Sequence, residues 1–457
     1  MIILLVGVFL LLAVAVPIGV AFALPSILGA NALGIPPETF AASVPHETAM
    51  SFTLVAIPYF LLAGQIMQRG GLMERLIDLA NSLLGWLRGA LGYVMIASSA
   101  MLGAITGSSV ATVATMGQTV GQSMQRQGYD RGYVGALTGA SGLLGVLIPP
   151  SIPLIIYSTV AGVSVGDMFI ATIVPGVLMI GAFMVVHRLM LRRALPTSAE
   201  IPEGVAVGAA GVSGSSKPGG TATSSAADGG ATALGSGPGL VRQSLSRTAV
   251  RAVPALLMPV ILFGGLYSGI MTPTEAAAVA ALYGLIATLV LRGMSLKTLP
   301  AVFYAAALPS IAILSIVVFS SVFSRLITLE RIPQAIAETA TSVTTSAIVF
   351  LLLMNLVLLL VGMFMETNAA VLLMAPLFVP AALAFDLDPV HFGIILVTNI
   401  ELGLLTPPLA ANLYVAAKTT GAPIVSMMSS VLPFFAAALT VQLLITYVPV
   451  LTTWHLS

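Results

Sequence analysis

The chain consists mostly of long apolar stretches separated by short polar ones. A helix needs roughly 20 apolar residues to cross about 30 Å of hydrocarbon, where it satisfies its own backbone hydrogen bonds. The apolar pattern therefore predicts an all-α polytopic membrane protein with nine crossings. The expected crossings are residues 2–28, 48–67, 133–162, 168–190, 252–270, 275–291, 300–324, 390–418 and 424–448.

Two further apolar stretches, residues 92–124 and 346–384, carry polar residues at their centres. We interpret both as re-entrant helical hairpins that return to the side from which they enter. Each follows a segment that mixes apolar positions at helical spacing with charges, residues 71–88 and 328–342. These two segments are predicted to be arm helices that lie along the membrane interface, with a simple connecting loop as the alternative.

Composition narrows the class further. Charged residues make up 7% of the 457 positions, against roughly 25% in a soluble domain, so a water-facing surface cannot be built. The absence of cysteine excludes disulfides, thiolate catalysis and cysteine-ligated metal. The four histidines are scattered and the chain has no phosphate-binding glycine-lysine loop, so we expect no cofactor, no transition metal and no ATP hydrolysis. A net charge of +1 without a basic run argues against nucleic acid as a partner.

The basic residues predict the orientation in the membrane. With a cytoplasmic N-terminus, 15 of the 17 lysine and arginine residues fall on the cytoplasmic side, and only Arg325 and Arg331 fall outside. This split holds only if both hairpins return to the side they entered. We therefore predict a bacterial inner-membrane protein with a cytoplasmic N-terminus and a periplasmic C-terminus.

Residues 194–250 differ in character from the rest of the chain. Glycine, serine and alanine dominate the centre of this segment. Such a segment cannot bury enough apolar surface to offset the entropy of ordering it. It is predicted to be a flexible cytoplasmic linker between two halves, residues 1–193 and 251–457.

The two halves repeat each other. The motif GVLIPP at 145–150 recurs as GLLTPP at 403–408, an offset of 258 residues, and the same offset places Ser109 on Thr367. Two patterns in the same register indicate a duplication. The additional crossing at 252–270 makes the second half enter from the opposite face, so the repeat is inverted. Interrupted apolar segments at corresponding positions of inverted halves indicate a transporter with a binding site near the membrane midplane.

The interruptions have the chemistry of a binding site. Two successive prolines unwind a helix, so the segments 133–162 and 390–418 are predicted to be broken transmembrane helices. Carbonyl groups that lose their donors before such a break suit a small hard cation, and the helix N-termini that restart after it suit an anion. The hairpin centres, residues 107–112 and 366–368, add hydroxyl, amide and carboxylate groups. The alternative is that the small hydroxyl residues serve only in helix packing.

Two carboxylates and two asparagines within the predicted membrane segments are further candidates. Glu366 and Glu401 are the only carboxylates placed there, and an isolated charge costs at least ~2.5 to 3.5 kcal/mol on insertion scales, so each is expected to pair with a cation or a proton. A structural carboxylate is the alternative for both. Asn399 and Asn412 flank the second proline pair, as ligands or as interhelical hydrogen-bonding groups.

The motifs resemble one known family. The stretches IPYFLLAG (57–64), GSSVATVATMGQ (107–118) and GLLGVLIPPSIPLIIYS (142–158) resemble the large membrane (M) subunit of tripartite ATP-independent periplasmic (TRAP) transporters. The stretches GMFMETNAAVLLMAPLFVP (362–380) and ELGLLTPPLAANLYVA (401–416) resemble the second half of the same subunit. The resemblance covers nearly all of the chain apart from the central linker.

This resemblance implies a sodium-coupled secondary importer of the elevator type, in which the hairpins and broken helices move against a scaffold braced by the arm helices. It implies two partners: a small four-helix membrane (Q) subunit, expected as a separate chain, and a periplasmic substrate-binding (P) protein. The P protein would deliver an organic acid, such as a dicarboxylate or a sugar acid. The implied solute is thus a small carboxylate.

The resemblance also implies site residues at matching positions. One sodium site would use Ser108, Gly145, Ile148 and Pro149, and its symmetry mate would use Gly403, Thr406 and Pro407 near Glu366. The residues facing substrate would be Ser109, Thr112, Thr367, Asn368 and Asn412.

Three other functions remain open from the sequence. A stand-alone divalent-anion and sodium symporter of similar design would need no binding protein. A membrane-embedded enzyme would use Glu366 and Glu401, but no histidine, cysteine or lysine lies nearby for acid–base or metal chemistry. A passive channel would conduct its solute without saturation.

Overall fold

The structure is a computed structural model that describes residues 7–456, apart from positions 9, 12, 13 and 15 and the segment 196–244. Most of the predicted linker 194–250 and part of the predicted crossing 2–28 lie outside the described residues. Helix α13 (Ile173–Ala194) ends where the linker was expected to begin, but α14 (Leu245–Tyr267) begins inside the expected linker.

Every regular element in the described ranges is a helix. Seven of these helices are long and apolar enough to cross a membrane, or up to nine if each of two bent pairs counts as one span. One bent pair is Arg131–Leu147 with Ile152–Ala161, where the axis turns by 43° at the first proline pair. The architecture is therefore that of a polytopic α-helical membrane protein.

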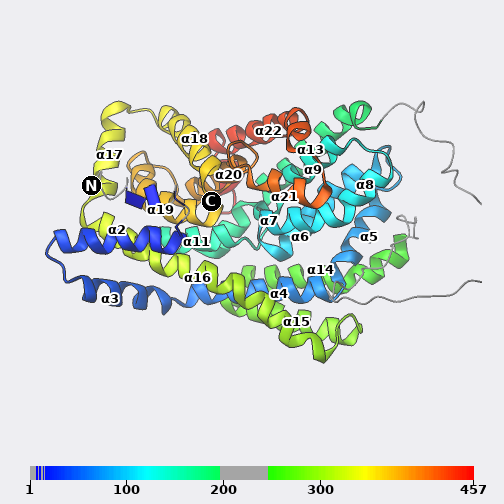
Figure 1. Cartoon of the computed structure of the whole chain (residues 1–457), viewed down its shortest axis with the longest axis horizontal. Coiled ribbons are helices and arrows are strands. Elements are labelled where there is room, and N and C mark those ends of the chain that lie inside the picture. The colour runs from blue at the N-terminus through cyan, green and yellow to red at the C-terminus, as the bar shows by residue number, and fades with distance from the viewer. Residues whose placement is uncertain (1–6, 9, 12–13, 15, 196–244, 457) are drawn as a thin grey trace, which may run out of the picture.

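One layer of the molecule combines helices from both halves of the chain (Figure 1). In this layer α4 packs on α15, α16 crosses α2, α3 and α4, and α14 packs on α5 and α15. Its members besides α14 are α2 (Ile18–Ala32), α3 (Pro37–Ala49), η1 (Phe52–Val55), α4 (Ala56–Arg69), α5 (Leu72–Leu84), α15 (Pro273–Val290), η3 (Leu296–Thr298) and α16 (Leu299–Leu329).

The other layer contains the interrupted segments of both halves. Here α9 and α13 pack on α22, α18 on α20, and α11 on α19. The first half contributes, with α13, the elements α6 (Ala90–Thr106), α7 (Ser109–Met116), the π-helical turn η2 (Gly117–Gly121), α8 (Gln122–Arg126), α9 (Arg131–Ser141), α10 (Leu144–Leu147), α11 (Ile152–Ala161) and α12 (Val165–Ala171). The second half contributes α17 (Ile332–Val343), α18 (Ala347–Phe364), α19 (Thr367–Ala384), α20 (Pro389–Gly403), α21 (Ala411–Thr420), α22 (Ile424–Tyr447) and α23 (Val450–Thr453).

The helix boundaries repeat with the offset that the sequence motifs share. Helix α7 begins at Ser109 and α19 at Thr367, and α9 begins at Arg131 and α20 at Pro389, so both pairs of starting residues are 258 positions apart. The helices α5 and α17, which precede the interrupted segments, correspond to within two positions of the same offset. This agreement supports a duplication of the whole unit.

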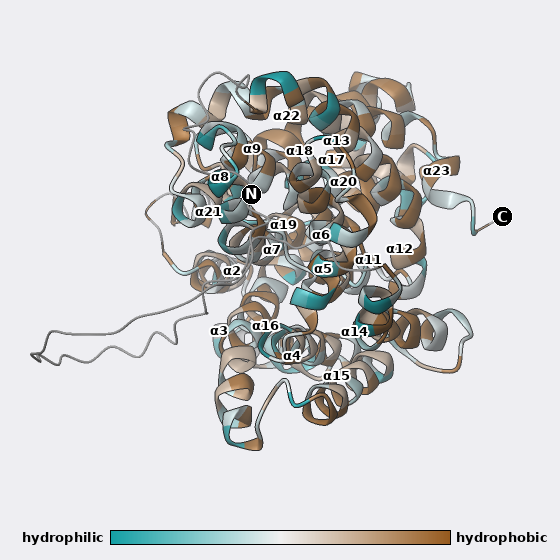
Figure 2. Ribbon diagram, turned by 90° about the vertical axis from the view of Figure 1, so that its right-hand side faces the viewer, coloured by the Kyte–Doolittle hydropathy of each residue, from teal (hydrophilic) through white to brown (hydrophobic). Residues whose placement is uncertain are grey.

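The outer faces of the first layer are apolar. Val260, Leu282, Ile286, Leu308 and Ile311 are all exposed on α14, α15 and α16. The ribbon is correspondingly brown over most of these helices in Figure 2. Large apolar side chains exposed on three helices would be a liability in water and are what a helix needs against lipid.

Two features of the helices differ from the sequence-based expectations. Residues 37–49 form α3, which bends by 60° into the segment Phe52–Arg69, whereas no helix was predicted there. The segment 346–384 was expected to be one re-entrant unit, yet its two arms α18 and α19 are each 18 residues long, enough to cross by length alone. In the segment 92–124 the chain does fold back, because α8 packs against α6.

Candidate functional site

The first interruption is a sharp turn between α6 and α7. Gly107 adopts a left-handed conformation (φ +59°), and a Cβ atom there would lie 2.7 Å from the Pro150 carbonyl oxygen, so only glycine fits. Ser108 is extended and caps α7, with its hydroxyl accepting the N–H of Ala111 at 3.5 Å. The Thr112 hydroxyl donates to the Ser108 carbonyl at 2.9 Å and fixes the turn from behind. We call residues 106–112 the first tip.

The second interruption lies between α18 and α19, at the position equivalent to the first, but it carries a charge. Helix α18 ends at Phe364, and Glu366 caps α19 by accepting the N–H groups of Asn368 at 3.0 Å and Ala369 at 3.3 Å. The Asn368 side-chain amide donates to the other carboxylate oxygen at 2.7 Å. A carboxylate at a helix N-terminus is stabilised by the unpaired N–H groups and the helix dipole. We call residues 365–368 the second tip.

A second carboxylate lies behind the second tip. Glu401 is on α20, two positions before the end of that helix, and is fully buried. One of its oxygens accepts the Thr367 hydroxyl at 2.7 Å, and the Ser109 side chain of the first tip also hydrogen-bonds to the carboxylate. Glu366 and Glu401 therefore lie in the same region of the molecule.

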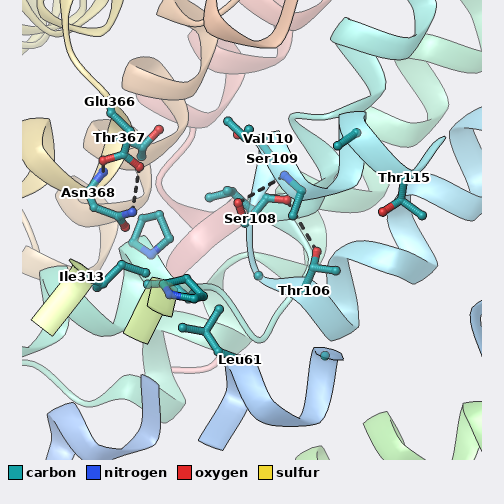
Figure 3. A pocket seen from close by; sticks show the side chains of 18 of the residues that line it. Leu61, Thr106, Ser108, Ser109, Val110, Thr115, Ile313, Glu366, Thr367 and Asn368 are labelled. Atoms are coloured by element: carbon teal, nitrogen blue, oxygen red, sulfur yellow. Dashed lines mark hydrogen bonds between the residues drawn. The ribbon is translucent and has the colours of Figure 1, made fainter. Parts of the chain in front are cut away.

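The two tips face each other across a cavity of about 330 Å³ between the two layers (Figure 3). The polar residues of its wall that the sequence analysis named are Ser108, Ser109, Glu366, Thr367, Asn368 and Glu401. No lysine, arginine or histidine of the described chain lines the cavity. An anion that enters must therefore be recognised by hydroxyl and amide groups, helix N-termini or bound cations rather than by basic side chains.

The wall also contains residues that the sequence analysis missed. Gln65 and Gln68 come from α4, and Pro309 and Ile313 come from α16, so the first layer forms one side of the cavity. The Gln68 amide donates to the Thr115 hydroxyl of α7 at 3.3 Å and joins the two layers. Two glutamines three positions apart on one face of an otherwise apolar helix are a signal that could have indicated this role.

The first proline pair lies directly behind the first tip. A Cβ atom at Gly145 would lie 2.7 Å from the Ser108 carbonyl oxygen, so the break and the tip touch backbone to backbone. Ile148 is extended, and because residues 149 and 150 are prolines, the Gly145 carbonyl has no donor four positions later. No hydrogen bond to this carbonyl is present in the described part of the chain. This is the open oxygen that the sequence predicted.

The second proline pair departs from that prediction. The Gly403 carbonyl was also expected to be open, but it accepts both the N–H of Thr406 at 2.9 Å and the Thr406 hydroxyl at 2.7 Å. A threonine three positions later can fold its hydroxyl back onto such a carbonyl, and the proline at 407 does not prevent this. Pro149–Pro150 and Pro407–Pro408 are otherwise alike, each with a cis peptide bond.

Three predicted residues lie away from the cavity. Thr112 is behind the first tip, where its hydroxyl also contacts that of Thr106 at 3.1 Å. Asn412 is fully buried against α9, and neither its oxygen nor its nitrogen has a partner among the described residues. Asn399 donates to Asn355 at 2.6 Å in a buried amide cluster between α18, α20 and α22, which agrees with the interhelical alternative.

The comparisons with known proteins agree on one family. Residues 5–451 match the family model described as the DctM component of tripartite ATP-independent periplasmic transporters. The chain is 37% identical over 405 residues to the C4-dicarboxylate TRAP transporter large permease protein of Pseudomonas aeruginosa, covering 88% of this chain and 86% of that one. It is 33% identical to the sialic acid TRAP transporter large permease of Vibrio cholerae over 97% of this chain and 95% of the relative.

Two further matches extend this comparison. The isethionate TRAP transporter permease protein DctMQ of Oleidesulfovibrio alaskensis is 36% identical over 96% of this chain, which spans 64% of that relative. A solved structure, the YdaH transporter of Alcanivorax borkumensis, has a similar fold, with a TM-score of 0.58 at 14% identity over 89% of this chain and 86% of that one. The relatives are transporter permease subunits and not enzymes. On this evidence the chain belongs to the family of large membrane subunits of tripartite ATP-independent periplasmic transporters.

Proposed function

We propose that this chain is the permease subunit of a sodium-driven importer of small organic acids. The observation that carries the proposal is the cavity between the two tips. It combines two helix N-termini, hydroxyl and amide groups, and two carboxylates, and no basic side chain of the described residues lies on its wall. A site of this composition binds an anion only together with cations, because two uncompensated carboxylates would repel it. Coupling to a cation gradient then follows from charge balance.

The substrate class rests on the relatives and on the wall of the cavity. The relatives named above transport C4-dicarboxylates, sialic acid and isethionate, which are all small organic acids. Ser109, Thr367 and Asn368 line the cavity and offer hydroxyl and amide groups to an acid. Thr112 and Asn412 are placed behind the wall, so we assign them to supporting the tips rather than to substrate contact.

The coupling ions are assigned to the two proline breaks. In the first half, Gly145, Ile148 and Pro149 would supply carbonyl oxygens next to that of Ser108, where the unpaired Gly145 carbonyl supports the assignment. In the second half, Gly403, Thr406 and Pro407 would serve with Glu366. A sodium ion there would have to share the Gly403 carbonyl with the Thr406 N–H.

The transport mechanism is proposed to be an elevator between inverted halves. The interrupted segments of both halves form one layer, and the cavity lies where this layer meets α4 and α16 of the other. This division supports movement of one layer against the other. The distribution of basic residues supports an inner-membrane location with a cytoplasmic N-terminus and a periplasmic C-terminus.

The proposed partners are a periplasmic substrate-binding protein and a small four-helix membrane subunit. Membership of the family implies both partners. The relative from Oleidesulfovibrio alaskensis is named as a combined DctMQ protein, so the two membrane subunits occur together in at least one relative. For this chain we propose that the small subunit is a separate polypeptide.

The test is uptake by proteoliposomes that contain this chain and its small membrane subunit, with the binding protein added outside. Succinate and sialic acid are the probes. Accumulation is expected only under an inward sodium gradient and only with the binding protein. Accumulation under a proton gradient without sodium would disprove the coupling, and uptake by this chain alone would favour a stand-alone symporter.

A further inference from the structure

A second cavity, of about 250 Å³, lies between the two layers and shares no lining residue with the cavity between the tips. No polar side chain of the described residues lies on its wall. The wall combines residues of both layers, among them Leu76 of α5, Leu256 and Pro259 of α14, Met101 and Ala104 of α6, and Ile148 at the first proline break. The boundary between the layers is therefore not closed by protein at this place.

Small side chains leave this space open. Ala100 and Ala104 of α6 are about one turn apart, and Ala255 of α14 lines the same cavity. Small residues in membrane helices commonly let two backbones approach closely, but here a space remains that is far larger than the voids of a close-packed interior. Water is a poor occupant, because a buried water needs two to four polar partners and the wall offers none among the described side chains.

The cavity opens at the middle of α14. Leu256 is the central residue of this 23-residue helix, and it lines the cavity while 38% of its surface is exposed. Val253 and Val260, about one turn to either side, are exposed as well. The opening is therefore continuous with the apolar surface of the first layer that faces lipid, at the depth of the hydrocarbon core.

We propose that this cavity is a lipid-binding site, filled by one acyl chain of a bilayer phospholipid that enters between the layers past Leu256. A transmembrane helix is too wide for it, because its diameter with side chains is about 10 Å. An acyl chain is narrow and flexible and brings no polar group that would need a partner in the cavity. The chain would reach Ile148, so a lipid would contact the first proline break directly.

The experiment is photo-crosslinking in liposomes that contain the complex of the full chain with its small membrane subunit. The probe is phosphatidylcholine with a diazirine on one acyl chain, and mass spectrometry locates the lipid adducts after irradiation. Met101 is the diagnostic position, because it lines the cavity and is half-buried on a helix whose other residues are mostly buried. We expect adducts on Met101 as well as on Val260 of the outer face.

Variants that fill the cavity should exclude the lipid. Ala104→Phe places a ring in the cavity, and we expect it to lower the adducts on Met101 about tenfold relative to those on Val260, because the added volume displaces the acyl chain. The matched control is Ala307→Phe, which adds the same ring at an exposed position of α16 and should leave both adducts unchanged. Leu256→Trp narrows the opening from an exposed position and should reduce the Met101 adducts in the same way.

The outcomes separate this inference from the proposed function. Adducts on Val260 without adducts on Met101 would overturn the lipid site, and so would equal labelling of Met101 in Ala104→Phe and the wild type. If Ala104→Phe does not fold, Leu256→Trp decides in its place. Labelling of Met101 in the chain alone but not in the complex would mean that the small subunit covers the opening, which also overturns the proposal. Labelling requires no sodium and no solute, so a failure of succinate uptake in the same liposomes would contradict only the proposed function.

Discussion

The two proline breaks share a backbone plan but differ in how they treat one carbonyl group. Gly145 and Gly403 occupy equivalent positions, yet the Gly145 carbonyl is unpaired while the Gly403 carbonyl accepts two hydrogen bonds from Thr406. The residue equivalent to Thr406 in the first half is Ile148, which has no hydroxyl. The backbone differs as well, because the Thr406 N–H bonds the Gly403 carbonyl whereas the Ile148 N–H bonds the Leu144 carbonyl. Both the side chain and the local backbone therefore leave the first break with an open oxygen and close the second.

The two tips differ in charge, and here the second half carries the additional oxygen atoms. The first tip is neutral, with Ser108 as its cap, and the second carries the Glu366 carboxylate, with Glu401 behind it. The first half therefore offers an unpaired backbone carbonyl, and the second half offers side-chain carboxylates. The tips of the two halves therefore differ in charge, although their helices begin at equivalent positions.

The largest effect that would test this comparison comes from the equivalent glycines. A Cβ atom at Gly403 would lie 2.3 Å from the Gly362 carbonyl carbon and 2.7 Å from the Met363 nitrogen, which are backbone atoms that cannot move aside. We expect Gly403→Ala to lower the free energy of unfolding by about 3 kcal/mol.

At Gly145 the contacts are partly with a side chain. A Cβ atom would lie 2.5 Å from the Thr112 hydroxyl, which can rotate, and 2.7 Å from the Ser108 carbonyl oxygen. We expect Gly145→Ala to cost about 1 to 2 kcal/mol, less than Gly403→Ala. Unfolding of both purified variants in mixed detergent micelles gives the order, and an equal or reversed order would contradict the geometry.

A smaller effect is expected from the caps of the two tips. Glu366 accepts two N–H groups of α19, so Glu366→Ala should destabilise the protein by about 1 kcal/mol. The Ser108 cap bond is 3.5 Å long, so Ser108→Ala should cost about 0.5 kcal/mol or less. Glu366→Asp is the control, because a shorter carboxylate still caps a helix. Unfolding midpoints that do not distinguish the two alanine variants would mean that the charge at the second tip has no capping role.

Much of the second layer could be predicted from the sequence, because a duplication is read from residue identities alone. The offset of 258 residues locates the starts of α19 and α20 from those of α7 and α9. The proline pairs locate the breaks, since proline removes a donor wherever it occurs. The same alignment pairs Ser109 with Thr367, and both line the cavity.

The remaining features depend on tertiary contacts that no local pattern contains. Asn412 was expected at the site, but the rotation of α21 directs it against α9, and only the packing of that helix decides this. The Thr406 hydroxyl could have turned to the cavity or to the Gly403 carbonyl, and sequence spacing allows both. The contribution of Gln65 and Gln68 required knowing that α4 faces the first tip.

The smallest effect concerns how each tip is attached to the first layer. The first tip's helix α7 is joined to α4 by the hydrogen bond from Gln68 to Thr115 at 3.3 Å, whereas no side-chain hydrogen bond joins α19 to α16 among the described residues. Because this bond is accessible to solvent, we expect Gln68→Leu to cost about 0.5 kcal/mol.

A double-mutant cycle with Thr115→Val isolates the bond. The coupling energy between the two substitutions should be about 0.5 kcal/mol, and additive losses would mean that the contact contributes nothing. If α7 moves relative to α4 during transport, the bond must break once in each cycle. Gln68→Leu should then change the uptake rate at saturating succinate while a conservative change on α16, Ile313→Leu, does not. Equal rates for both variants would indicate that the two tips are attached to the first layer in the same way.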